Sequence, residues 1–166
     1  MWVADLTYIR LRFGFVYLAV IMDAFSRRAI GWALGRTPEA ELTVRALNLA
    51  LRNRRPAAGL IRHSDGGVQY AAHDYVAILR EHGARPSMSR PGIPTDNASC
   101  ERFIGTLKRG EIYLRDYDDF DDAGASIGRF IDIVYNHKRL HSALGYVPPA
   151  EFEASLKERS LMPTPA

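Results

Sequence analysis

The first third of the chain carries three apolar runs separated by short polar breaks. Residues 2–10 alternate between apolar and polar positions and are rich in β-branched and aromatic side chains, which is typical of a β-strand. Residues 15–23 are almost continuously apolar, which predicts a strand buried on both faces. A third strand is predicted over 29–34. Because the breaks at Gly14 and at 26–28 are short, the three strands are expected to form an antiparallel meander.

The spacing of apolar residues then changes from strand-like to helical. Thr37 is a suitable N-cap and Pro38 suits the first position of a helix, which Pro56 would stop. A short strand is predicted over 60–63, followed by a second helix over 71–82.

The second half of the chain is predicted to be mainly helical. A fifth strand is expected over 84–88, and the turn-rich residues 89–96 are expected to form a mobile loop. A helix over 97–114 follows, then a helix capped by Asp121, and a last short helix from Pro149. The apolar face of the helix after Asp121 is expected to consist of Ala123, Ile127, Phe130, Ile131, Val134 and Tyr135. This order predicts an α/β fold, with a five-stranded mixed sheet flanked by helices.

The length of 166 residues fits one domain. We divide it into a core over 1–115, a helical extension of the same domain over 116–160, and a tail over 161–166. The end of the chain, after about Arg159, is expected to be frayed. The one cysteine, Cys100, excludes an internal disulfide, is interpreted as a small buried apolar residue, and fits a reducing compartment. The net charge of +3 weakly favours a polyanionic partner. No targeting segment or membrane-spanning run is predicted.

Three acidic residues stand in separate predicted elements. Asp5 lies in the first strand, Asp65 follows the fourth strand, and Glu101 lies in the first turns of a helix, with 35 residues between the last two. Carboxylate oxygens are the protein ligands that Mg²⁺ prefers. Asp23 is a rival first carboxylate, but its neighbours indicate a turn, where aspartate commonly makes local hydrogen bonds.

The flanks of these acids carry a family resemblance. They read Trp-x-x-Asp-x-Thr-Tyr from Trp2, His-Ser-Asp-x-Gly-x-Gln-Tyr from His63, and Asp-Asn-Ala-x-x-Glu-x-Phe from Asp96. A fourth motif, Tyr-Asn-x-x-Arg-x-His-x-x-Leu-Gly-Tyr-x-x-Pro, runs from Tyr135 to Pro149. Together they resemble the integrase core of bacterial insertion-sequence transposases, within the DDE transposase and retroviral integrase superfamily.

The resemblance implies a fold, a metal site and a reaction. It implies an RNase H-like fold, in which Asp5 lies beside the end of the strand that carries Asp65, and a helix brings Glu101 across. It also implies that these three acids hold two Mg²⁺ or Mn²⁺ ions and catalyse phosphoryl transfer on DNA, both strand cleavage and strand transfer.

Further residues are candidates for DNA contact. Asn97, Glu101 and Lys108 share one helix face by their spacing, and the resemblance places Asn97 and Lys108 beside the substrate. Arg139 and His141 could touch DNA phosphates or could cap the core. Tyr135, in the same motif, is interpreted as structural. His63 is either a partner of the metal ligands or a hydrogen-bonded surface histidine.

Two alternative functions remain open at this point. One is an RNase H-like nuclease without strand transfer, and the other is a non-catalytic DNA-binding remnant of a transposase. The expected partners are the transposon ends, target DNA and further copies of the chain. Relatives of this kind carry an upstream helix-turn-helix region, which is expected to be missing here. The expected location is the bacterial cytoplasm, on the nucleoid.

Overall fold

The computed structural model describes residues 1–89 and 97–161. The loop expected over 89–96 therefore falls almost entirely outside the described residues, as do the last five residues of the expected tail.

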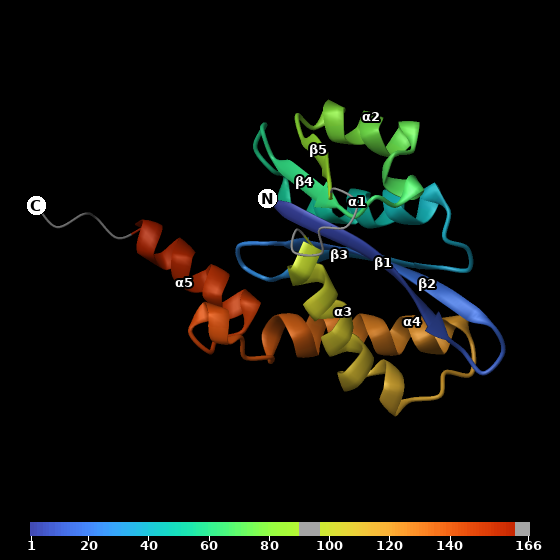
Figure 1. Cartoon of the computed structure of the whole chain (residues 1–166). Coiled ribbons are helices and arrows are strands. Elements are labelled where there is room, and N and C mark those ends of the chain that lie inside the picture. Colours follow the sequence, from blue (N-terminus) through green and yellow to red (C-terminus); the bar gives the residue numbers. More distant parts are fainter. Residues whose placement is uncertain (90–96, 162–166) are drawn as a thin grey trace, which may run out of the picture.

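A five-stranded mixed sheet forms the centre of the molecule (Figure 1). Its strands are β1 (Trp2–Arg10), β2 (Phe15–Asp23), β3 (Ala29–Gly35), β4 (Ile61–Ser64) and β5 (Arg85–Met88). They lie in the order β3-β2-β1-β4-β5. The first three form the predicted antiparallel meander, while β4 is parallel to β1 and β5 is parallel to β4. The predicted mixed sheet is confirmed.

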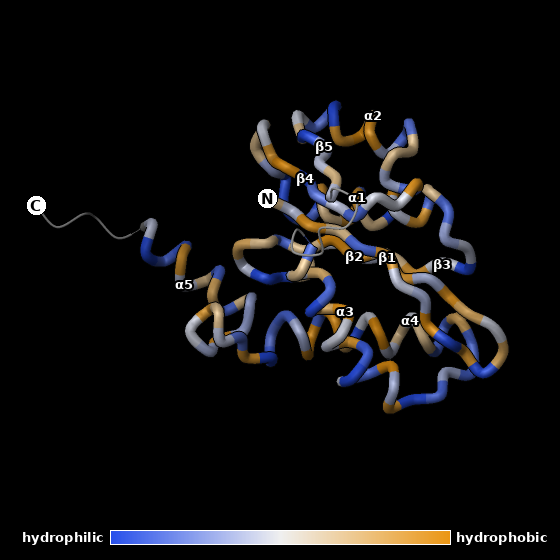
Figure 2. The backbone as a smooth tube through the Cα atoms, in the orientation of Figure 1, coloured by the Kyte–Doolittle hydropathy of each residue, from blue (hydrophilic) through white to orange (hydrophobic). Residues whose placement is uncertain are grey.

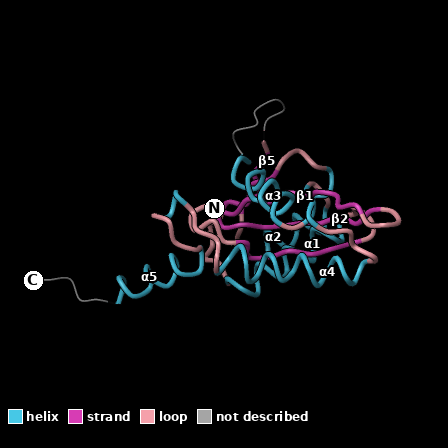
Figure 3. Tube along the Cα trace, turned by 90° about the horizontal axis from the view of Figure 1, so that it is seen from below, coloured by secondary structure: helices cyan, strands magenta, loops and turns pink. Residues whose placement is uncertain are grey.

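Helices cover both faces of this sheet (Figures 1 and 3). The helices are α1 (Ala40–Arg54), α2 (His73–Glu81), α3 (Ala98–Gly110), α4 (Phe120–Arg129) and α5 (Pro149–Leu161). Helices α1 and α2 lie on one side and α3 and α4 on the other. Three short 3-10 turns, at Val68–Tyr70, Ile112–Leu114 and Ser142–Leu144, and a π-helical turn at Phe130–Tyr135 complete the described helical elements.

Successive side chains of β1 point to opposite faces of the sheet, and each face packs into its own hydrophobic core. Trp2 and Ala4 of β1 face the core under α1 and α2, while Val3 and Ile9 face the core under α3 and α4. The central strands are correspondingly apolar along most of their length (Figure 2). Gly31 of β3 allows close contact with α1, because a Cβ there would lie 2.4 Å from the Ala46 carbonyl oxygen.

The first helix starts later than predicted. Thr37 and Pro38 were expected to begin it, but the helix starts at Ala40 after an extended Glu39. The Pro38 carbonyl oxygen instead accepts a hydrogen bond from Gln69 Nε2 at 2.9 Å. A tertiary contact therefore holds this residue outside the helix.

The helix predicted over 97–114 is interrupted at Glu111. Its backbone leaves the helical region (φ −140°, ψ −60°), and a 3-10 turn follows. The buried Glu111 carboxylate accepts hydrogen bonds from Ser126 and Tyr117, and pairs with Arg115 at 2.9 Å. Turning the chain at this point lets one carboxylate join α3 to α4.

The N-cap of α4 is Asp119 and not Asp121. Asp119 Oδ1 accepts hydrogen bonds from the backbone N–H groups of Asp121 and Asp122, each at 2.9 Å. The predicted apolar face is also wrong at Val134, which is 36% exposed. The other five predicted residues of this face are buried, including Tyr135 in the π-helical turn.

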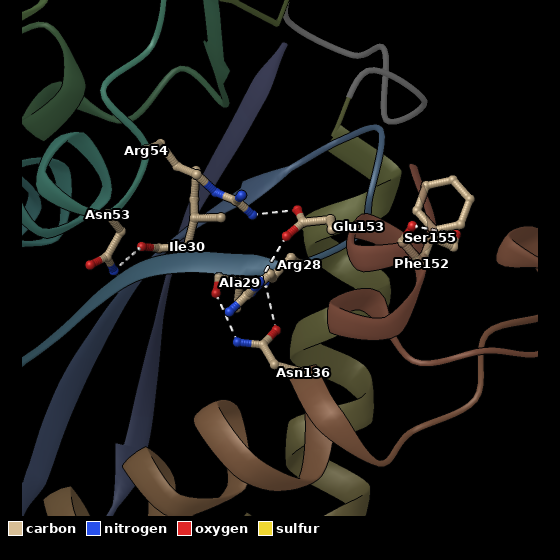
Figure 4. A network of polar contacts seen from close by, with 9 residues as sticks. All are labelled: Arg28, Ala29, Ile30, Asn53, Arg54, Asn136, Phe152, Glu153 and Ser155. Atoms are coloured by element: carbon tan, nitrogen blue, oxygen red, sulfur yellow. Dashed lines mark hydrogen bonds and ion pairs between the residues drawn. The ribbon is translucent and has the colours of Figure 1, made fainter. Parts of the chain in front are cut away.

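The last helix, α5, points away from the sheet and is anchored at its first turns (Figures 1 and 4). Glu153 forms ion pairs with Arg28, at 2.8 Å, and with Arg54. Phe152 packs on Phe25 with ring centroids 5.5 Å apart. Across the described ranges, no helix is long and apolar enough to cross a membrane.

Candidate active site

Asp5 lies within β1 beside the point where the parallel strand β4 ends and Asp65 follows it. The register pairs Ala4 of β1 with Ser64 of β4, so the residue after each is a candidate carboxylate. A local N–H group orients each one: Leu6 N–H donates to Asp5 Oδ1 at 2.8 Å, and Gly67 N–H donates to Asp65 Oδ1 at 3.2 Å. The predicted juxtaposition of these two strands is therefore present.

Helix α3 brings Glu101 toward the part of β1 that carries Asp5. The start of α3 is tied to β1, because buried Asn97 donates from Nδ2 to the Ala4 carbonyl oxygen at 3.2 Å. Asn97 was predicted to touch DNA, but its side chain is only 5% exposed and lies against the sheet. It positions the helix, while Glu101 one turn later is exposed.

The electrostatics of Asp5 link the predicted groups. The pKa of Asp5 is raised to about 6, chiefly by burial, while the hydrogen bond from Leu6 opposes the rise. Repulsion from Asp65 and Glu101 contributes to the rise, and the Lys108 ammonium also opposes it. Three carboxylates and one lysine thus act on one another, and a cation between the carboxylates would relieve their repulsion.

Lys108 is held by an aromatic residue that the sequence analysis did not single out. Its Nζ lies 5.5 Å from the centroid of the Tyr8 ring, a cation–π distance. Tyr8 in turn packs edge-on against Phe15, with centroids 5.7 Å apart. Although 61% exposed, Tyr8 is thus fixed between two neighbours. Its place three residues after Asp5 in the same motif was the available signal.

The donor set suits a hard divalent cation, because the groups are carboxylate oxygens. Within residues 1–89 and 97–161, however, no three His, Cys, Asp or Glu side chains are close enough together to hold a metal ion. Glu101 is exposed at the start of α3, so its carboxylate would have to approach the other two on metal binding.

Buried Arg62 is a second residue that sequence reasoning missed. It lies on β4, three residues before Asp65, and is 1% exposed. Its guanidinium stacks on Tyr70 and Tyr75, 4.1 Å and 4.6 Å from their ring centroids. Its Nε and Nη2 find no hydrogen-bond partner among the described residues. A single arginine in the short strand β4 gave no sequence signal that its side chain would be buried between two tyrosine rings.

His63 and Asp23 each make hydrogen bonds that orient their side chains. His63 is buried rather than at the surface, and its ring nitrogens hydrogen-bond to Ser87 and Ser89 at 3.0 and 2.9 Å. Asp23 Oδ1 accepts the Phe25 N–H at 2.9 Å, which is the predicted turn contact.

Cys100 is fully buried in the core under α3, as predicted. Burial raises the pKa of its thiol, which keeps it protonated.

The motif from Tyr135 to Pro149 divides into a structural and an exposed part. Tyr135 is buried edge-on against Phe103, with centroids 4.7 Å apart. Asn136 pairs with both backbone groups of Ala29, accepting at 3.0 Å and donating at 2.9 Å (Figure 4). Arg139 and His141 line a separate cavity on another face of α3, away from the three carboxylates.

Residues 1–94 match a family profile described as an integrase core domain, and residues 82–149 match a second profile with the same description. The chain belongs to the integrase core domain family.

Curated relatives of this integrase core come from bacterial insertion sequences. It is 45% identical over 152 residues to the insertion element IS600 uncharacterized 31 kDa protein of Shigella sonnei, covering 92% of this chain and 56% of that protein. It is 40% identical to the transposase for insertion sequence element IS904 of Lactococcus lactis, covering 92% and 60%. Transposase InsF for insertion sequence IS3A of Escherichia coli is 38% identical, with 92% and 53% covered. The chain thus spans 53% to 60% of the length of these relatives.

Solved structures share the fold of the integrase core. The simian T-cell lymphotropic virus intasome in complex with a PP2A regulatory subunit has a TM-score of 0.74 at 18% identity, covering 99% of this chain and 56% of that one. The HTLV-2 integrase catalytic core domain in complex with magnesium has a TM-score of 0.71 at 16% sequence identity, and the match covers 91% of this chain and 93% of that one. The catalytic domain of Mos1 mariner transposase has a TM-score of 0.64 at 15% sequence identity, and the match covers 78% of this chain and 68% of that one. The predicted RNase H-like fold is confirmed.

Proposed function

We propose that this integrase core is the catalytic part of an insertion-sequence transposase, which cleaves DNA strands and transfers them to new DNA by metal-dependent phosphoryl transfer. The observation that carries the proposal is that Asp5, within β1, and Asp65, directly after β4, lie on neighbouring strands, next to the start of α3, which Asn97 ties to Ala4 and which carries Glu101. The insertion-sequence relatives support the DNA substrate.

Asp5, Asp65 and Glu101 would hold the metal, two Mg²⁺ or Mn²⁺ ions in this proposal. The fit rests on oxygen donors and on the mutual repulsion that raises the pKa of Asp5. When bound, such ions activate the attacking oxygen and stabilise the leaving oxygen of an in-line displacement at phosphorus.

The remaining residues orient these groups and the DNA. The N–H groups of Leu6 and Gly67 each hold one carboxylate oxygen, which leaves the second oxygen of each group available. Lys108 carries a positive charge beside Asp5, suited to a backbone phosphate next to the reacting one. Tyr8 restrains the lysine through its ring.

The proposed partners are transposon ends, target DNA and further copies of the chain, in the bacterial cytoplasm. Contacts with phosphates do not read sequence, so the core alone is expected to bind DNA without marked preference for terminal repeats. A titration comparing terminal-repeat with scrambled duplex at matched salt tests this, and selective binding by residues 1–166 alone would contradict it.

Cleavage and strand transfer by the full-length protein, with each acid replaced in turn, test the proposal. Asp5→Asn, Asp65→Asn and Glu101→Gln should each reduce both reactions to background. Asp23→Asn is the matched control, because an asparagine oxygen still accepts the Phe25 N–H. Intact cleavage in any of the first three variants refutes the assigned site. Cleavage without joined products would assign a nuclease instead, and metal-independent DNA binding alone would indicate a non-catalytic protein.

A further inference from the structure

A cavity of about 300 Å³ lies between α3, the turn after β2 and the segment after the π-helical turn. Its lining includes four arginines and a histidine, which define what we call the arginine pocket: Arg27, Arg102, Arg109, Arg139 and His141. No aspartate or glutamate is among the described residues that line it. So many cations without a lining carboxylate indicate an anion as the missing partner.

Three of the arginines are held in place by neutral groups, and none of them pairs with a carboxylate in the part of the chain that the structure describes. Arg27 has a left-handed backbone (φ 61°) and donates from Nη1 to Ser99 Oγ at the start of α3. Arg102 Nε donates to the Ala98 carbonyl oxygen at 3.1 Å. The Arg109 guanidinium folds back over Gly105, where a Cβ would lie 3.3 Å from Arg109 Nη1. These contacts orient the side chains, and their neutral acceptors do not cancel the positive charges.

The π-helical turn places the fourth arginine. The Arg139 N–H donates to the Val134 carbonyl oxygen at 2.8 Å, five residues back, which continues the wide π-type spacing. Such turns inside helices are frequent at functional sites. Arg139 is exposed at the rim of the pocket.

His141 faces the pocket with a nitrogen that lacks a partner. Its ring packs edge-on against Tyr135, with centroids 5.0 Å apart. Its carbonyl oxygen accepts the N–H groups of Leu144, at 3.0 Å, and of Tyr146, at 2.9 Å, so the residue is firmly placed. Its Nε2 is buried and has no hydrogen-bond partner among the residues that the structure describes. Burial lowers the pKa of His141, and the nearby Arg139 and Arg27 lower it further.

The chemistry of this pocket suits a phosphate group. Guanidinium groups bind phosphate oxygens in a planar, two-pronged geometry, and hydroxyl groups donate to the remaining oxygens. Ser99, Thr106 and Ser142 supply such hydroxyls in the lining. A cavity of about 300 Å³ is too small for a duplex but large enough for one backbone phosphate.

The position of the pocket on α3 connects it to the proposed active site. Glu101 and Lys108 are followed directly by Arg102 and Arg109, so the two pairs lie about 100° apart around one helix. A DNA strand that passes the carboxylates can therefore meet the arginine pocket on the adjacent face of α3.

We propose that the arginine pocket binds a backbone phosphate of the DNA that is held at the carboxylate site. This inference rests on the proposed function, and it assigns a role to the motif from Tyr135 to Pro149. Arg139 and His141 contact the phosphate in this assignment, while Tyr135 and Asn136 hold them in place from within the core.

DNA binding by residues 1–166, measured by fluorescence anisotropy with a random-sequence duplex over a series of salt concentrations, tests the pocket. Arg139→Ala and Arg102→Ala should each weaken binding several-fold, and each should lower the slope of log K against log salt by about 0.9. Arg80→Ala is the matched control, since Arg80 is exposed on α2 and does not line the pocket. Equal affinity and slope in the wild type and both pocket variants overturn the proposal, as does a wild type that binds no duplex.

The NMR signals of the His141 imidazole give a second, local readout. A phosphate in the pocket should raise the pKa of His141 when duplex is added, because it offsets the two arginines. The rise should be smaller in Arg139→Ala and unchanged in Arg80→Ala. If the pKa of His141 in the wild type does not change when duplex is added, the proposed phosphate site is refuted. The two proposals fail separately: if both pocket variants bind duplex more weakly than the wild type but the full-length protein never cleaves DNA, only the proposed function is refuted.

Discussion

Replacing Asp5 with asparagine should stabilise the metal-free protein. The pKa of Asp5 is raised from 3.8 to about 6, chiefly by burial and against the Leu6 hydrogen bond. Each pKa unit between the folded and unfolded states corresponds to 1.36 kcal/mol. The ionised Asp5 carboxylate therefore costs the folded state about 3 kcal/mol at neutral pH. Asparagine keeps the shape and the oxygen that accepts the Leu6 N–H but removes the charge.

The effect has a defined direction with pH. The folded state binds the Asp5 proton more tightly than the unfolded state, so the contribution of this group to stability falls as pH rises. The cost is absent below the unfolded pKa of 3.8, grows up to about 6, and is fully present above that. The wild type and Asp5→Asn should therefore converge in acid and separate toward neutral pH.

Thermal unfolding without metal, at about pH 4 and about pH 8, measures this difference. For a domain of 166 residues, about 3 kcal/mol corresponds to a rise in Tm of roughly 6–12 °C at the higher pH. Mg²⁺ or Mn²⁺ should reverse the order. A ligand at about 1,000 times its Kd stabilises a protein by about 4.1 kcal/mol, which exceeds the cost of about 3 kcal/mol, and only the wild type keeps all three carboxylates.

Asp23→Asn serves as the control, because its carboxylate makes a local turn contact away from the other acids. Its Tm should stay near that of the wild type at both pH values, with or without metal. A lower Tm of Asp5→Asn than of the wild type at about pH 8 without metal would refute the electrostatic reasoning. Equal stabilisation of both proteins by metal would remove Asp5 from the metal site.

Three further predictions concern DNA contact and packing. Lys108→Ala should lower the salt slope of DNA binding by about one unit, and Tyr8→Leu should change that slope while Tyr8→Phe, which keeps the ring, should not. Asn136→Ala should cost about 2–4 kcal/mol of unfolding free energy in a denaturant titration, because the first residue of β3 loses partners for both of its buried backbone groups. Gly31→Ala should cost about 3 kcal/mol or more, because the new Cβ meets the backbone of α1, whereas Gly124→Ala has room and should be tolerated.

The strands and the candidate metal ligands could be predicted from the sequence because the signals for both lie in short, contiguous stretches of the chain. The alternation in residues 2–10 and the apolar run in 15–23 follow from whether each face of a strand meets solvent or core, which is encoded residue by residue. Asp5 and Asp65 could be named because their flanking motifs are contiguous, and the parallel pairing of β1 with β4 brings them together.

Other features depended on contacts between residues distant in sequence. Pro38 stays outside α1 because Gln69 takes its carbonyl oxygen, and α3 ends early because Glu111 turns toward α4. Asn97 lies under α3 against Ala4 rather than facing DNA, although its spacing from Glu101 predicted a shared face.

The arginine pocket most clearly separates what the sequence predicts from what only the tertiary structure determines. Arg139 and His141 were recognisable as a motif, but the sequence left open whether they bind DNA or cap the core. Only the tertiary structure brings Arg27 and Arg102 beside them, because the turn after β2, the outer face of α3 and the π-helical turn converge there. A side chain's type follows from the sequence, whereas the electric field around it is set by whichever distant charges the fold places nearby.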